Sequence, residues 1–95
     1  MLSHEDIKKL SRKEFTDLLR QTSTDFADEI YFKYDVDFVF DHYDSDLKVV
    51  YVRESENTKN SVTYEMLSEL LIELKKLNNR MQIGILFEDI PSGGS

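Results

Sequence analysis

The run between Ile30 and Phe40 is the feature that most constrains how this chain folds. Apolar side chains stand at every second position of this run, and most of the intervening residues are polar. A period of two predicts a half-buried β-strand. Residues 41–46 have the composition of a turn, and the Val- and Tyr-rich segment 47–53 predicts a second strand. We therefore expect an antiparallel hairpin over residues 30–53.

Two helical patterns flank the predicted hairpin. Ser11 and Glu14 have the spacing of a capping box, and the apolar residues that follow predict a helix over residues 11–22. Leucines at helical spacing predict a second helix over residues 62–78, and residues 81–87 predict a third strand. The expected fold is therefore α+β, with the order α-β-β-α-β and a three-stranded, mostly antiparallel sheet that has two helices packed on one face.

The chain length and composition bound the organisation of the protein. A chain of 95 residues fits one compact α+β domain, which we expect over residues 1–90, with a flexible tail or linker over residues 91–95. The chain has no cysteine, shows no secretory signal and has no apolar run near the roughly 20 residues of a membrane span. These features predict a cytoplasmic protein.

The formal net charge of −7 is confined to one segment, from Asp25 to Asp46. This segment holds eight acids and one base, Lys33, whereas the rest of the chain has eleven of each. Nucleic acids and anionic membranes require clusters of Lys and Arg, so we expect neither as a direct partner. A basic protein surface is the expected partner, because opposite charges attract and steer association.

The acids and tyrosines of this segment form the predicted partner-binding surface. Carboxylates on a strand and a turn make a negative field like the one that DNA presents to its binding proteins, and tyrosine adds contact area against Arg and Lys. Alternatively, the acids serve only to keep the protein in solution and to guard a sheet edge. The predicted binding residues are Asp28, Glu29, Tyr31, Asp35, Asp37, Asp41, Tyr43, Asp44 and Asp46.

The sequence contains no recognisable arrangement for catalysis or metal binding. His42 lies among aspartates, but the ligand spacing of a zinc site or a calcium loop is missing. Gly84 stands alone inside a predicted strand, where it indicates a bulge or a close approach of the backbone. We therefore expect a protein that is not an enzyme and that has no cofactor and no metal site.

One short segment resembles a known family. The run LSRKEF from Leu10 to Phe15, followed by Leu18 and Leu19, resembles the opening helix of colicin-type immunity proteins. Those proteins are small, acidic and all-helical, and they neutralise a nuclease toxin, whereas this chain also has strong strand patterns. In size and charge the chain also resembles phage-encoded anti-restriction and anti-CRISPR inhibitors.

These patterns lead to one functional hypothesis and two alternatives. The leading hypothesis is a stoichiometric inhibitor of the DNA-mimic type, whose acidic hairpin blocks the basic nucleic-acid-binding site of a bacterial enzyme such as a nuclease. One alternative is an immunity or antitoxin protein that neutralises a basic nuclease toxin. The other is a structural or adaptor domain that oligomerises through an apolar surface, for which Val39, Val50 and Val52 are candidates. A monomer and a homodimer are both compatible with these patterns.

Overall fold

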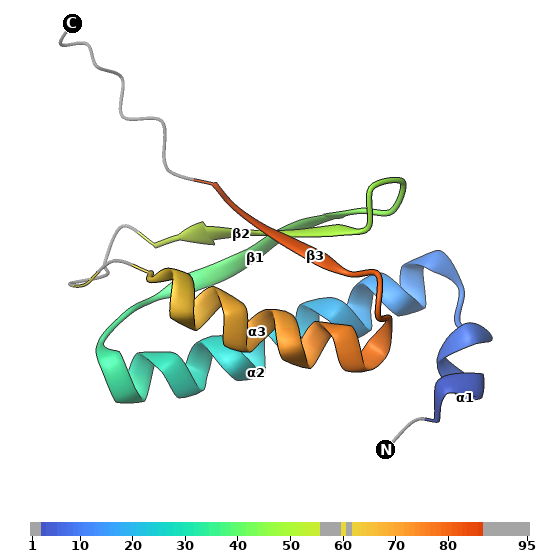
Figure 1. The fold of residues 1–95 in the computed structure, drawn as a ribbon, viewed down its shortest axis with the longest axis horizontal. Coiled ribbons are helices and arrows are strands. Elements are labelled where there is room, and N and C mark those ends of the chain that lie inside the picture. Colours follow the sequence, from blue (N-terminus) through green and yellow to red (C-terminus); the bar gives the residue numbers. More distant parts are fainter. Residues whose placement is uncertain (1–2, 56–59, 61, 87–95) are drawn as a thin grey trace, which may run out of the picture.

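The computed structural model describes residues 3–55, 60 and 62–86. Its elements are α1 (His4–Lys8), α2 (Arg12–Tyr34), β1 (Phe38–Asp44), β2 (Val49–Glu54), α3 (Tyr64–Leu77) and β3 (Gln82–Leu86). The strands form one layer, and α2 and α3 lie together against one of its faces (Figure 1). The predicted α+β class and α-β-β-α-β order are confirmed, with the short α1 added in front. The tail predicted over residues 91–95 lies outside the described residues.

β2 is the central strand of the sheet, between β1 and β3. β1 pairs with β2 in the antiparallel sense, as expected of a hairpin. β3 runs parallel to β2, because α3 carries the chain back along the sheet between the two strands. The sheet is therefore mixed, with one antiparallel and one parallel pair, and is not mostly antiparallel as predicted.

The strand predicted over residues 30–40 is wrong in its first half, because α2 continues to Tyr34. Leu19, Ser23, Ala27 and Ile30 are buried along one side of this helix. Their spacing of three and four residues is that of a helix face held against a sheet. Since Ser23 and Ala27 are small, this stripe lacks the large apolar side chains that usually mark a helix in a sequence.

The change from helix to strand takes place within three residues. Asp35 ends α2 in the left-handed region, with φ 57° and ψ 38°, and its N–H donates to the Tyr31 carbonyl at 3.0 Å. Aspartate is one of the few residues other than glycine that adopt this conformation readily. Val36 is then fully buried, and β1 begins at Phe38.

β1 extends further than predicted, so that residues 41–44 are strand and residues 45–48 form the turn. The Asp44 carboxylate accepts hydrogen bonds from the backbone N–H groups of Asp46 and Leu47, both at 3.0 Å. Lys48, with φ 57°, completes the reversal. The register of the hairpin shifts between Phe40 and His42, which makes Asp41 the extra residue of a β-bulge.

The core fills the space between the sheet and the two long helices. Val50 and Val52 are fully buried in it, so the predicted apolar oligomer surface that included them is wrong. Of that set only Val39, which is 50% exposed, reaches the surface. The largest fully buried apolar side chains are Leu19, Val36, Phe38, Val50, Val52, Leu70, Leu74 and Met81.

Gly84 marks a close approach between neighbouring strands. A Cβ atom at this position would lie 2.8 Å from Cε1 of Tyr51, and Cβ atoms in proteins do not approach other heavy atoms so closely. The Tyr51 ring also stacks on His42, with the ring centroids 4.7 Å apart. Tyr51 is thus held between its two cross-strand neighbours, His42 on β1 and Gly84 on β3.

We expect Gly84→Ala to destabilise the domain by about 1–2 kcal/mol, because the added methyl group displaces the Tyr51 ring. Urea unfolding measures this change in the free energy of unfolding. In a Tyr51→Ala background the same substitution should cost nothing or stabilise slightly, since alanine loses less conformational entropy than glycine. Equal destabilisation in both backgrounds would show that the contact with Tyr51 is not the cause.

Candidate partner-binding surface

Four exposed aromatic side chains lie where α2 ends and α3 begins. Phe32 is 87% exposed and Tyr64 86%, and Tyr31 and Tyr34 are about half exposed. The two helix ends are neighbours (Figure 1), and the Asn60 side-chain amide donates to the Tyr34 carbonyl at 2.9 Å. The other exposed large apolar side chains in the described part of the chain are spread over β1, the turn and α3.

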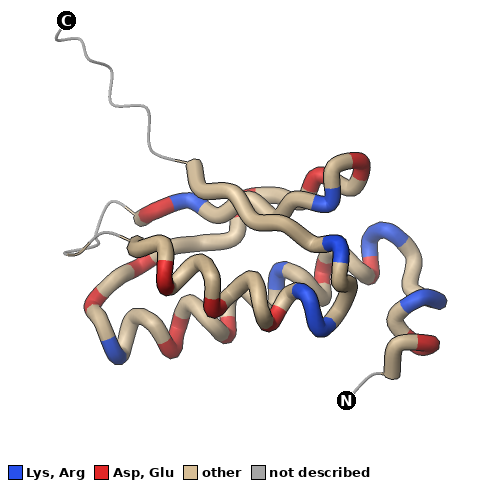
Figure 2. Tube along the Cα trace, viewed as in Figure 1, with Lys and Arg blue, Asp and Glu red and all other residues tan. Residues whose placement is uncertain are grey.

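Acidic residues flank these aromatic residues along both helices. Residues 21–35 and 64–73 together contain seven acids and a single base, Lys33. Figure 2 shows these acids along the neighbouring halves of α2 and α3, whereas most Lys and Arg residues lie toward the other end of the molecule. We call this surface the acidic-aromatic end, and it comprises Asp25, Asp28, Glu29, Tyr31, Phe32, Tyr34, Asp35, Tyr64, Glu65 and Glu69.

The packing of α2 sets the direction of these side chains. Ile30 is buried against the sheet, and Phe32 follows it by two residues, which is about 200° around a helix. Phe32 therefore points away from the sheet. Asp28 precedes Phe32 by four residues and lies on the same outward face. One outward face of α2 thus presents carboxylate and aromatic groups together.

The first half of the predicted binding surface belongs to this end, although it is helical. Asp28, Glu29 and Tyr31 lie on α2 and not on a hairpin strand. Asp35 is the cap of the same helix. Asp37 lies between α2 and β1, where its backbone carbonyl accepts a hydrogen bond from the Ser55 N–H at 2.9 Å.

Asp41 lies on β1, away from the acidic-aromatic end, and its charge is engaged locally. Its carboxylate contacts His42 Nδ1 at 2.5 Å and accepts a hydrogen bond from the Arg53 guanidinium at 2.6 Å. The hydrogen bond with His42, helped by the charge of Arg53, holds the pKa of Asp41 below its ordinary value. A carboxylate whose charge is balanced by these neighbours contributes little to the negative potential that a partner would meet.

The remaining predicted residues, at the tip of the hairpin, also have local roles. Asp44 caps the turn that contains Asp46. Tyr43 faces the helices, where its ring meets Phe15 edge to face with centroids 5.8 Å apart. Burial raises the pKa of the Tyr43 hydroxyl above its ordinary value. The structure therefore does not bring these three residues together with Asp28, Glu29 and Tyr31.

Sequence reasoning did not identify Phe32, Tyr34 and Tyr64 as site residues. Phe32 and Tyr34 fit the inward positions of a strand, and Tyr64 fits the apolar face of the second helix. One pattern in the sequence could have identified Phe32. Leu19, Ser23, Ala27 and Ile30 follow helical spacing, although two of them are small. Once that spacing is extended to residue 34, Phe32 falls opposite the buried face.

Asp41 should make the stability of the protein depend on pH in the acidic range. Because its pKa is lowered in the folded state, the unfolded chain takes up the proton first. The stabilisation is therefore complete above the ordinary aspartate pKa of about 3.9 and is lost as the pH falls through the lowered value. Asp41→Asn should flatten this part of the profile, measured by urea unfolding between about pH 6 and about pH 2.5.

Asp46→Asn is the matched control for that substitution, because it removes one negative charge from the turn. It should keep the slope of the original protein. An equal flattening by both substitutions would contradict a specific role for the contacts of Asp41 with His42 and Arg53.

The part of the chain that the structure describes has no metal-binding cluster and no membrane-spanning helix. Within residues 3–55, 60 and 62–86, no three His, Asp or Glu side chains are grouped so that they could hold a metal ion. No helix in this part of the chain has the length and apolar character needed to cross a membrane. No protein family, curated protein sequence or solved structure gives a significant match to this chain.

Proposed function

We propose that this protein is a stoichiometric inhibitor that binds a basic protein surface through its acidic-aromatic end. The observation that carries the proposal is the coincidence of four exposed aromatic rings with surrounding carboxylates at one end of the helical layer. Clustered exposed aromatic side chains mark interaction surfaces, and Tyr and Phe are enriched at protein interfaces. Acids that served only solubility would not explain the exposure of Phe32.

The chemistry of the surface indicates the class of partner. Glu65 and Glu69 on α3 stand one turn apart, as do Asp25 and Glu29 on α2. Like charges at this spacing destabilise a helix slightly, and a cationic partner removes that repulsion. Arginine and lysine also interact favourably with the faces of aromatic rings. The nucleic-acid-binding groove of a nuclease presents such cations, so occupation of that groove would block the enzyme.

The proposed binding surface is the acidic-aromatic end and not the acidic hairpin predicted from the sequence. The hairpin carboxylate of Asp41 is engaged by His42 and Arg53, and that of Asp44 caps the turn. The α2–α3 end, in contrast, carries exposed aromatic rings and contains one base, Lys33, among its acids. An inhibitor of a host enzyme and an immunity protein against a toxin would use this surface in the same way and would differ only in the partner.

Charge reversal at one end of the molecule tests the proposal. Asp28→Lys plus Glu29→Lys should weaken binding to a basic nuclease about tenfold or more, chiefly through slower association, and should reduce its salt dependence. The measurements are surface plasmon resonance and inhibition of DNA cleavage with a panel of purified basic nucleases. An arginine-rich peptide, titrated into the 15N-labelled protein, reports the binding surface directly.

The matched control is Glu5→Lys plus Asp46→Lys, which makes the same change of charge outside the acidic-aromatic end. This pair should leave binding nearly unchanged. The proposal is contradicted if the control weakens binding as much as the reversal on α2, if the peptide shifts signals elsewhere, or if neither the peptide nor any nuclease binds.

Phe32→Ser separates binding from stability. Because Phe32 is 87% exposed, its replacement should change the free energy of unfolding by no more than about 0.5 kcal/mol. A central aromatic contact should cost about 1–2 kcal/mol of binding energy when it is removed. Thermal unfolding and the same binding assay measure the two effects. A partner complex of unchanged affinity would show that the aromatic ring is not part of the interface.

A further inference from the structure

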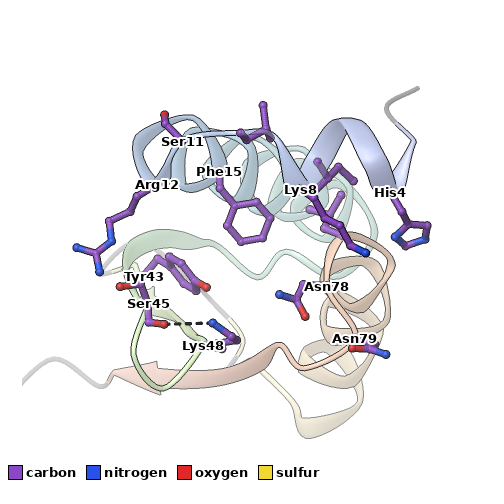
Figure 3. Close-up of a pocket in the computed structure, with 13 residues that line it drawn as sticks. His4, Lys8, Ser11, Arg12, Phe15, Tyr43, Ser45, Lys48, Asn78 and Asn79 are labelled. Atoms are coloured by element: carbon purple, nitrogen blue, oxygen red, sulfur yellow. Dashed lines mark hydrogen bonds between the residues drawn. The ribbon is translucent and has the colours of Figure 1, made fainter.

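A cavity of about 670 Å³ lies at the other end of the molecule from the acidic-aromatic end. It is partly open to solvent and is bordered by α1, the start of α2, the hairpin turn and the end of α3 (Figure 3). Its volume is within the range of pockets that bind small molecules. None of the residues that line it takes part in the surface proposed above, so what binds here is independent of that proposal.

The interior of the cavity is partly apolar. Phe15 and Tyr43 pack edge to face along it, and Ile7 and Leu77 add aliphatic surface. Figure 3 shows Phe15 and the amide of Asn78 directed into the space from different elements. A planar ring would find aromatic and aliphatic contacts here. The Asn78 amide nitrogen offers a donor, whereas its oxygen accepts a hydrogen bond from the Arg80 N–H at 2.9 Å.

The rim of the cavity is cationic. Lys8 comes from α1, Arg12 from the start of α2 and Lys48 from the hairpin turn, and no Asp or Glu lines the cavity. The Lys48 ammonium has only a long contact of 3.5 Å with the Ser45 carbonyl. Among the described residues, none of these three cations forms an ion pair. Three unpaired cations at one cavity are unexpected in a protein with a net charge of −7.

We propose that this cavity binds a small organic anion, in which a phosphate or carboxylate group is carried on a planar apolar body. The anionic group lies at the rim of the cavity, where Lys8, Arg12 and Lys48 supply positive charge. The planar body lies against Phe15 and Tyr43. This arrangement satisfies both the unpaired cations and the apolar interior, which neither inorganic phosphate nor a neutral ring does alone.

The test uses four simple probes and the 15N-labelled full chain. Phenyl phosphate and benzoate each combine an anion with a ring, benzyl alcohol is the neutral counterpart, and inorganic phosphate lacks the ring. In NMR titrations at low salt, phenyl phosphate or benzoate should bind in the millimolar range and shift the amide signals of residues that line the cavity. The stronger of the two identifies the preferred anionic group. Benzyl alcohol and inorganic phosphate should each bind at least severalfold more weakly.

Paired substitutions locate the site. Lys8→Gln plus Lys48→Gln should weaken the binding of the better probe about fivefold, as expected for the loss of two partly exposed ionic contacts. Lys9→Gln plus Lys13→Gln removes the same charge from residues that do not line the cavity, and it should leave the affinity nearly unchanged. The proposal is overturned if both pairs weaken binding equally, if benzyl alcohol binds as tightly as the anions, or if no probe shifts the cavity residues.

Discussion

The packing of α2 against the sheet is the constraint on which the rest of the molecule depends. Leu19, Ser23, Ala27 and Ile30 are the buried stripe that holds the middle of the helix in place. With 23 residues, α2 is about 34 Å long, so its two ends are far apart. Its first turn supplies Arg12 and Phe15 to the cavity, and its last turns supply the acidic-aromatic end. One buried helix stripe thereby positions both candidate sites.

The net charge of −7 is not spread evenly over the molecule. Acids prevail where α2 ends and α3 begins, whereas cations line the cavity at the opposite end (Figure 2). A uniform negative surface would repel every anion. Because fields between exposed groups fall off within about 10 Å in ordinary salt, each end of this protein presents its own sign to a ligand. A cationic protein and a small anion are therefore compatible with the same chain.

Several acids that looked functional are used to build the hairpin. The bulge at Asp41 places its carboxylate beside His42 and Arg53, and Asp44 receives two backbone N–H groups in the turn. Aspartate is a poor strand residue, so its presence in β1 calls for a physical reason. The structure supplies one, since these side chains satisfy donors within the hairpin itself.

Local patterns in the sequence were sufficient for much of the fold. The capping box is formed by Ser11 and Glu14 at 3.0 and 3.1 Å, and α3, β2 and β3 lie within one or two residues of their predicted ranges. These features depend on neighbours a few residues apart, which is the range over which periodicity and capping act. The confinement of the net negative charge to residues 25–46 was equally a property of the sequence alone.

The tertiary structure decided where α2 ends, which way β3 runs and which side chains meet. The alternation after Ile30 fits a strand. In the structure, Ser23, Ala27 and Ile30 are instead buried along one side of a helix that continues to Tyr34. That continuation turns Phe32 outward and divides the predicted acidic hairpin between two distant regions. The cavity brings together residues from three separate stretches of sequence, 4–15, 43–48 and 77–79. The sequence by itself determined which local elements form and where the charge lies, whereas long-range packing determined which groups share a surface, because such contacts leave no local period.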